Sequence, residues 1–246
     1  MENNRIKAKE DMMQYTKDIC EALQQADFDK LNRAREGILK CADNIFSDER
    51  DKINAYKIVA ASYSGAYNQA EILPLAKKIV KIAKEIYPKN SSEQVEAYDL
   101  LAQTSFAAGK YDDTRKLAEE LYRYYYKKYG KDNRKAVKTL QLIGMCYWKT
   151  GQYQEGVEYL EECYQEALDF YGKTDMDTLQ YQRTYGMAVF YMGDSVYAEE
   201  ILKSANRTAL IEYGESHSLY LKTKQSLQAI KAAEEQAAEE RKKYAE

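Results

Sequence analysis

Residues 129–172 read YGKDNRKAVKTLQLIGMCYWKTGQYQEGVEYLEECYQEALDFYG, and they hold one full copy of a motif that recurs along the chain. The motif begins and ends on a Tyr-Gly pair, and the same pair returns at residues 213–214. Three sets of positions repeat at an interval of 42 residues: Tyr87, Tyr129, Tyr171 and Tyr213; Gly109, Gly151 and Gly193; and Ala60, Ala102, Gly144 and Gly186. Agreement of three sets on one interval is typical of a repeat protein, in which each copy is one structural unit.

The apolar residues within one copy are spaced as in amphipathic helices. They recur at steps of three and four residues, which places them on one face of a helix. A first helix ends at the Thr150-Gly151 turn, and polar residues after each Tyr-Gly pair can cap the helix that follows. Each repeat is therefore predicted to be a helical hairpin. The apolar faces are Val137, Leu140, Ile143, Gly144 and Tyr147 on the first helix, and Val157, Leu160, Cys163, Tyr164, Ala167, Leu168 and Tyr171 on the second.

The composition of the whole chain favours the same fold class. Among 246 residues there are 11 glycines and 2 prolines, whereas average usage would give roughly 17 and 12. Sandwiches, barrels and alternating strand-helix folds need frequent Gly/Pro turns. The sequence therefore predicts an all-α protein.

Charge and cysteine usage exclude several classes of partner. The 37 basic and 40 acidic residues give a net charge of −3, which offers no general attraction for nucleic acid or anionic membranes, even though the 24 tyrosines could stack on bases. Four widely separated cysteines and one histidine do not form a metal-binding pattern. We expect no metal, no cofactor, no nucleic-acid partner and no membrane partner, and we interpret the cysteines as small buried apolar residues of a cytoplasmic protein.

At the level of whole motifs, the repeat resembles the tetratricopeptide repeat (TPR). The resemblance is carried by Leu140, Ile143, Gly144, Tyr147, Gly151, Tyr153, Gly156, Leu160 and Cys163. The interval of 42 residues exceeds the common one of about 34, and together with the segments 171–175 and 213–217 it is similar to kinesin light chains and their bacterial relatives. This resemblance implies an all-α, right-handed α-solenoid, or superhelix, of about five TPR-like hairpins with a long C-terminal capping helix.

The expected organisation is a single solenoid over residues 1–246. Residues 1–49 are predicted to be a degenerate N-terminal hairpin, residues 50–217 the TPR-like repeats, and residues 218–246 a capping helix with a charged tail. The repeat at 50–88 is irregular, because Pro74 falls where its second helix should begin, and we expect a longer loop around residues 65–68. The alternatives for the tail are that it fills the groove or docks a partner.

The surface of such a stack points to a candidate binding site. The first helix of each hairpin is expected to line a concave groove, and large apolar side chains in a solvated groove have no packing reason to be there. Such side chains would bury the apolar anchors of a partner, with basic residues favouring acidic flanks. The alternative is that they pack against adjacent helices or the C-terminal helix. The candidate partner-binding residues are Phe106, Met145, Trp148, Lys149, Arg183, Met187, Phe190 and Tyr191.

These features predict a protein–protein or peptide-binding scaffold or adaptor. One alternative is a peptide-sensing regulatory domain that controls the activity of a partner protein, and another is a structural subunit without a ligand. No catalytic residue is predicted, because the sole histidine, His217, lies in a predicted linker. The sequence also has no nucleophile elbow, phosphate-binding loop or zinc-protease helix.

Overall fold

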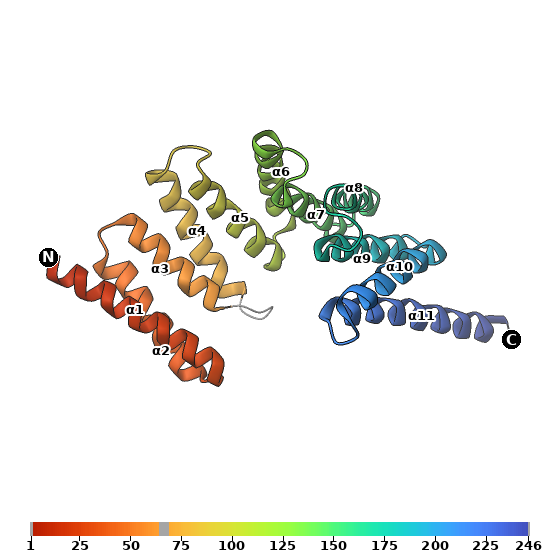
Figure 1. Cartoon of the computed structure of the whole chain (residues 1–246), viewed down its shortest axis with the longest axis horizontal. Helices are drawn as coiled ribbons and strands as arrows, with labels where there is room; N and C mark the ends of the chain where they lie inside the picture. The colour runs from red at the N-terminus through yellow and green to blue at the C-terminus, as the bar shows by residue number, and fades with distance from the viewer. Residues whose placement is uncertain (1, 64–68, 246) are drawn as a thin grey trace. The chain divides into compact units, whose positions relative to one another are not determined.

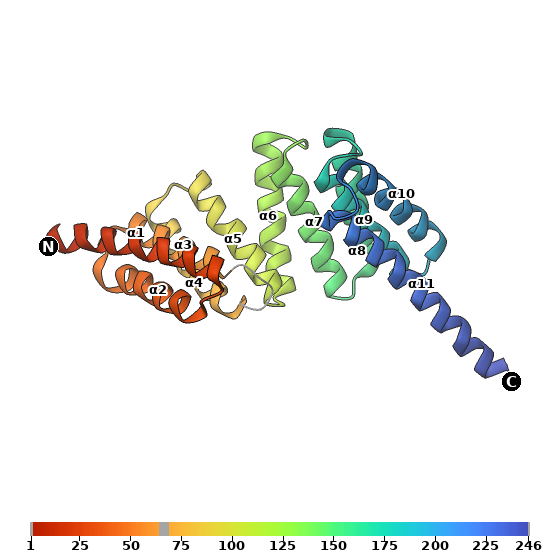
Figure 2. The same cartoon turned by 60° about the horizontal axis from the view of Figure 1, so that its bottom comes forward.

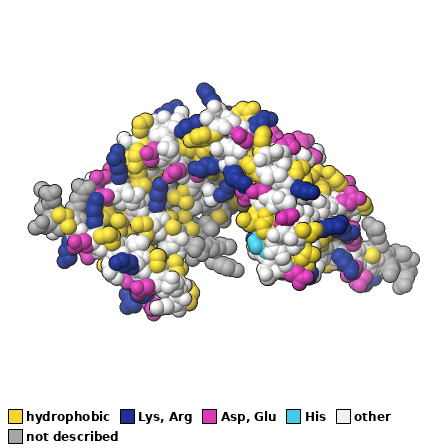
Figure 3. Space-filling view, in the orientation of Figure 1, with side chains coloured by type: hydrophobic (Ala, Val, Ile, Leu, Met, Phe, Trp, Pro, Cys, Tyr) yellow, Lys and Arg dark blue, Asp and Glu magenta, His cyan; other side chains and the backbone are white. Residues whose placement is uncertain are grey.

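A computed structural model describes residues 2–63 and 69–245, and within these residues it contains helices and no strands (Figure 1). The chain divides into two compact units, Met1–Lys110 and Tyr111–Glu246, each built from helices that pack against their neighbours in sequence. None of the described helices is both long and apolar enough to cross a membrane. On the face seen in Figure 3, Lys and Arg side chains lie scattered among Asp and Glu. The predicted all-α solenoid is confirmed.

The first unit begins with a pair of helices. Its core contains Ile38, Ala42, Val59 and Ile79, all fully buried. Helix α1 packs on α2, α3 on α4, and α4 on α5. The elements are α1 (Glu2–Gln25), α2 (Phe28–Lys40), a π-helical turn η1 (Cys41–Ile45), α3 (Glu49–Ser62), α4 (Gln69–Ile86) and α5 (Ser92–Ala107).

Helix α4 begins earlier than the sequence suggested. Pro74 was expected at a helix start, but α4 already begins at Gln69, so the proline lies beyond the first turn. The proline ring leaves the carbonyl of residue 70 without its usual intrahelical donor. The expectation about the position of Pro74 was wrong because the apolar face of α4, with Ile72, Leu75 and Ile79 buried, extends upstream of the proline. The loop expected around residues 65–68 lies outside the described residues.

The second unit holds the regular hairpins (Figure 2). Asn133 and Asp175 cap α7 and α9 by accepting hydrogen bonds from backbone amides, as the sequence predicts. Gly172 follows α8 at a φ of 82°, a backbone conformation that favours glycine. The helices are α6 (Tyr111–Tyr129), α7 (Arg134–Lys149), α8 (Tyr153–Tyr171), α9 (Met176–Tyr191), α10 (Ser195–Tyr213) and α11 (Ser218–Ala245).

Glycines mark the close crossing of α7 and α8. A Cβ atom added to Gly156 would lie 3.0 Å from the backbone nitrogen of Trp148, and one added to Gly144 would lie 3.0 Å from Cγ of Leu160. These two positions therefore allow the helix backbones to approach each other. The crossing also fixes the end of α7, which carries Trp148, against the first turns of α8.

Helix α11 packs on α9 and α10 in the register of the preceding repeat. The amide of Gln141 on α7 donates to the hydroxyl of Thr184 on α9 at 3.3 Å, and Nη1 of Arg183 on α9 donates to the hydroxyl of Ser226 on α11 at 3.5 Å. Both bonds join residues 43 positions apart. Helix α11 therefore begins in the place of a next first helix. Its buried residues are Leu219, Thr223, Ser226 and Ile230, whereas residues 231–240 are all exposed and continue past α10 in Figure 2.

Candidate functional site

Four aromatic side chains of the second unit meet where α7 and α9 end and α8 begins. We call them the aromatic patch, and they are Trp148, Tyr153, Phe190 and Tyr191. The rings of Trp148 and Tyr153 have centroids 4.8 Å apart in an edge-to-face arrangement. Tyr191 lies 5.9 Å from Trp148 and 5.5 Å from Phe190, measured between ring centroids. The residues belong to two successive hairpins, so the patch depends on how these hairpins stack.

The patch combines a packed base with an exposed outer surface. Trp148 and Phe190 are half-buried against a core cluster that includes Leu160, Val189 and Leu202. Tyr191 is 65% exposed and Tyr153 is 50% exposed. Aromatic side chains with an anchored base and an accessible face offer large contact area at a low entropic cost.

The structure brings five of the eight candidate residues into this region. Met145 and Met187 pack half-buried against the same core cluster as Trp148 and Phe190, and Tyr191 completes the group through its ring contacts. The packing alternative therefore applies to the inner faces of these side chains. Their role in partner binding stays a prediction.

Arg183 lies against α11, whereas a residue on the rim of an open groove would face solvent. Its side chain is half-buried, with Nη1 facing Ser226 and with a buried Nε that has no hydrogen-bond partner among the described residues. Burial lowers the pKa of the guanidinium. Leu227 and Ile230 of α11 also pack into the core cluster near the patch. Arg183 is thus at the junction of α9 and α11.

The remaining two candidate residues lie outside the group. Lys149 is exposed and directly follows Trp148 at the end of α7. Phe106 is half-buried near the end of α5, in the first unit, whereas the patch belongs to the second unit.

Tyr153 belongs to the patch, although it is not among the residues that the sequence predicted to line the groove. The sequence pattern placed it only as a repeat residue at the start of a second helix. The short turn at Gly151 brings this first residue of α8 back against Trp148. An aromatic residue two positions after the turn glycine was therefore the signal that could have identified it.

Among the described residues, the cysteines take part in no metal-binding group. Within residues 2–63 and 69–245, no three His, Cys, Asp or Glu side chains are grouped to hold a metal ion. Cys41, Cys146 and Cys163 are buried, and burial raises the pKa of the Cys146 thiol to about 12, which keeps it protonated. Cys20 is exposed on α1, so the interpretation of all four cysteines as buried was wrong for this one.

Comparisons with known proteins agree with the geometry of the hairpins. A sequence model of the tetratricopeptide repeat family matches residues 92–165 and 135–211. No curated protein is similar enough in sequence to count as a match.

Solved structures share the fold at low sequence identity. Repeats assigned to a kinesin light chain of Podosopora anserina are 16% identical, with 86% of this chain and 98% of that chain covered and a TM-score of 0.69. BtubC (BKLC) from P. vanneervenii is 13% identical over 92% and 84% of the two chains, with a TM-score of 0.62. Aspartyl phosphate phosphatase F from Bacillus subtilis is 14% identical over 92% and 60%, with a TM-score of 0.68. Identities this low indicate the fold alone.

Proposed function

We propose, from the premise that this chain is a tetratricopeptide-repeat protein with its repeats matched over residues 92–211, that it is a scaffold that binds a protein or peptide partner through the aromatic patch. The TPR fold is in general a non-catalytic protein-interaction scaffold. Because one fold serves many functions, the choice of site has to come from the side chains of this chain.

The observation that carries the proposal is the exposure of Tyr191 and Tyr153 around the half-buried Trp148. Exposed large apolar side chains that are contiguous mark interaction sites more often than those that stand singly. Tyr and Trp are also the residues that most often dominate the energy of binding interfaces. The patch therefore fits an apolar anchor residue of a partner.

Basic residues on α7 and α9, the helices that carry Trp148 and Tyr191, favour a partner with acidic character. Lys149 is exposed beside Trp148. Arg183 donates from Nη1 to the hydroxyl of Ser226 at 3.5 Å, and its Nε has no hydrogen-bond partner in the part of the chain that the structure describes. A carboxylate that reached either residue would gain a charge-assisted hydrogen bond. We therefore propose a ligand with one or two apolar anchors flanked by Asp or Glu.

Selection from a random peptide library against the whole chain tests the proposal. We expect enriched peptides to combine Phe, Trp or Leu with acidic residues. The double substitution Tyr153→Ala with Tyr191→Ala should weaken their binding at least about tenfold, which corresponds to 1.4 kcal/mol. Fluorescence anisotropy of a labelled peptide gives the dissociation constants.

The matched control is Phe170→Ala. Phe170 is an exposed aromatic residue near the other end of α8, so its removal should leave the affinity unchanged. If the enriched peptides bind the double variant and the wild type equally, or if Phe170→Ala weakens binding as much, the patch is not the binding site.

One observation favours the alternative of a peptide-sensing regulatory domain. The core cluster under Trp148 and Phe190 also contains Ile230 of α11, and Leu227 of α11 packs against it. A ligand bound to the patch would therefore contact side chains that pack on the same cluster as α11. Hydrogen exchange of α11 with and without a selected peptide separates the two functions. A change in protection over residues 218–230 supports the regulatory domain, whereas unchanged protection there supports the scaffold.

A further inference from the structure

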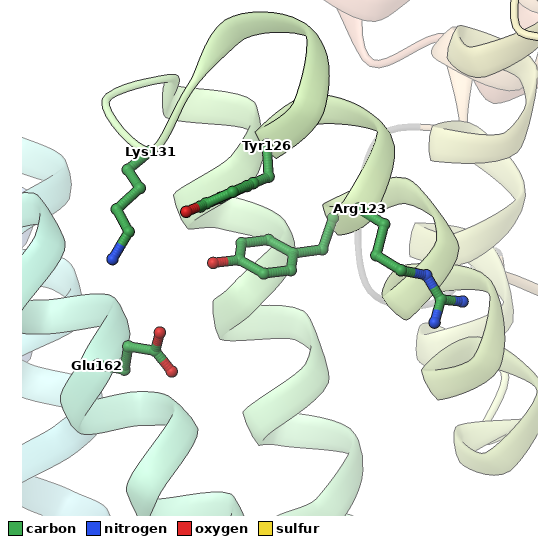
Figure 4. A pocket seen from close by; sticks show the side chains of 5 residues that line it. Arg123, Tyr126, Lys131 and Glu162 are labelled. Atoms are coloured by element: carbon green, nitrogen blue, oxygen red, sulfur yellow. The ribbon is translucent and has the colours of Figure 1, made fainter.

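A second feature of the second unit lies apart from the aromatic patch. It is a pocket of about 320 Å³ between α6 and α8 (Figure 4), which we call the tyrosine pocket. In Figure 4, the hydroxyl of Tyr126, the ammonium of Lys131 and the carboxylate of Glu162 point into one space, whereas the guanidinium of Arg123 points away from it. The lining residues are Tyr122, Arg123, Tyr126, Lys131 and Glu162.

A buried carboxylate with unfilled hydrogen-bonding capacity lies next to this pocket. Glu166 follows Glu162 by one turn of α8, and its side chain is only 9% exposed. Both of its carboxylate oxygens are buried and have no hydrogen-bond partner among the described residues. Burial and the nearby charge of Glu162 raise the pKa of Glu166, and Lys131 offsets part of this effect. Buried acceptors are normally satisfied, so an unsatisfied carboxylate indicates a missing donor.

The ammonium group of Lys131 is only weakly held beside the Glu166 carboxylate. Its Nζ lies 3.7 Å from Oε1 of Glu166, which is beyond hydrogen-bond distance, and its side chain is 53% exposed. The residue belongs to the short connection between α6 and α7, where a long side chain can move into solvent. Another cation can therefore take the place of its ammonium group.

The aromatic lining selects the kind of cation. The rings of Tyr122 and Tyr126 have centroids 5.9 Å apart with their planes at 48°, and such ring faces attract cations. Glu162 and Glu166, four residues apart, lie on one face of α8. A planar guanidinium has donors in several directions and also stacks on aromatic rings, so it can satisfy both carboxylates while it contacts a tyrosine.

We propose that the tyrosine pocket binds a guanidinium group, which donates to Glu166 and Glu162, lies against Tyr122 and Tyr126, and displaces the ammonium of Lys131. The group can belong to an arginine side chain of a partner or to a free guanidino compound. This inference is independent of the proposed function, because it involves α6 and the middle of α8 and uses no residue of the aromatic patch.

Isothermal titration of the full chain with two probes tests the inference. N-acetyl-arginine-methylamide represents an arginine side chain, and agmatine represents a free guanidino compound. We expect saturable binding that weakens at least fivefold in Glu166→Gln and in Glu162→Gln. Lys131→Ala should strengthen it, because the competing ammonium is removed. Capped lysine, N-acetyl-lysine-methylamide, should bind more weakly than capped arginine.

The matched control is Glu161→Gln. Its side chain is exposed and points about 100° away from that of Glu162 around the helix axis. Circular dichroism and thermal melting establish that each variant is folded. Tighter binding of capped arginine than of agmatine assigns the pocket to a partner side chain, and the reverse order assigns it to a free compound. The inference is overturned if neither probe binds saturably to the wild type and Lys131→Ala, or if Glu161→Gln weakens binding as much as Glu166→Gln.

Discussion

Among single residues, Glu166 has a carboxylate that is buried without a hydrogen-bond partner among the described residues. Its pKa is raised above the ordinary value of 4.5, mainly by burial. The folded state therefore binds this proton more tightly than the unfolded state. At neutral pH, Glu166 is ionised in the folded state and lowers the free energy of unfolding by its full amount. As the pH falls through the folded pKa towards 4.5, the side chain takes up its proton and this destabilisation disappears.

Glu166→Gln should therefore stabilise the protein at pH 7. We expect a gain of about 1 kcal/mol in the free energy of unfolding, because a buried charge that Lys131 offsets only in part is removed while the shape is kept. The gain should shrink as the pH approaches 4.5. Urea denaturation at several pH values measures it. A gain that stays constant down to pH 4.5, or one shared by Glu161→Gln, would mean that the charge of Glu166 is not its origin.

Trp148 and Tyr191 should differ in their effect on stability, although they touch each other. Trp148→Ala removes a half-buried ring from the core cluster, and we expect a loss of about 2 kcal/mol. Tyr191→Ala removes a mostly exposed ring, and we expect a change within about 0.5 kcal/mol. Chemical denaturation of the two variants measures this difference. Equal losses would indicate that Tyr191 is part of the core.

At the scale of helices, capping and ion pairing join neighbouring repeats. Asp175 caps α9 and also accepts from Arg134 at the start of α7, with Nη2 to Oδ2 at 2.6 Å. Asp194 caps α10 by accepting from the backbone amide of Tyr197. The hydrogen bonds from Arg134 are the main reason that the pKa of Asp175 lies below its ordinary value of 3.8. Asp175 thus links two first helices, whereas Asp194 serves one helix.

Replacement of these two residues tests the link. Asp175→Ala should cost about 2 kcal/mol, the sum of a cap and an ion pair, and Asp194→Ala about 1 kcal/mol. Because the folded pKa of Asp175 is lowered, its contribution is present above pH 3.8 and is lost as the pH falls through the folded pKa. The difference in stability between Asp175→Ala and Asp194→Ala should therefore become smaller at acid pH. Thermal melts from pH 7 to pH 3 measure it, and an equal cost at pH 7 would exclude a contribution from Arg134.

The elements show how far sequence alone reaches. The spacing of apolar residues and the cap residues predicted the hairpins α7–α8 and α9–α10, because both signals act within a few residues of the chain. The start of α4 was missed because burial against other helices outweighed the local effect of Pro74. The tyrosine pocket was missed because it combines side chains from α6, the following loop and α8. Such a combination depends on tertiary packing, which the repeat interval does not specify.

For the molecule as a whole, stability depends on how the stack of hairpins is closed. Each hairpin buries its flank on a neighbour, so the flank of the last hairpin needs a cover. The first part of α11 provides it, with Leu219 and Ile230 buried against α9 and α10. Residues 231–240 add no burial. The cover and the exposed extension are therefore separable.

Two truncations follow from this division of α11. A chain that ends at Lys231 should melt within about 1 °C of the full chain, because it loses only exposed residues from the described part of the helix. A chain that ends at His217 loses two buried apolar side chains and uncovers the surface beneath them. At about 2 kcal/mol for each side chain, the loss of about 4 kcal/mol should lower the melting temperature by about 10 °C. Scanning calorimetry of the three chains measures both effects. If the chain ending at Lys231 also melts about 10 °C lower, residues beyond 231 stabilise the stack, and α11 acts as one unit rather than as a cover with an exposed extension.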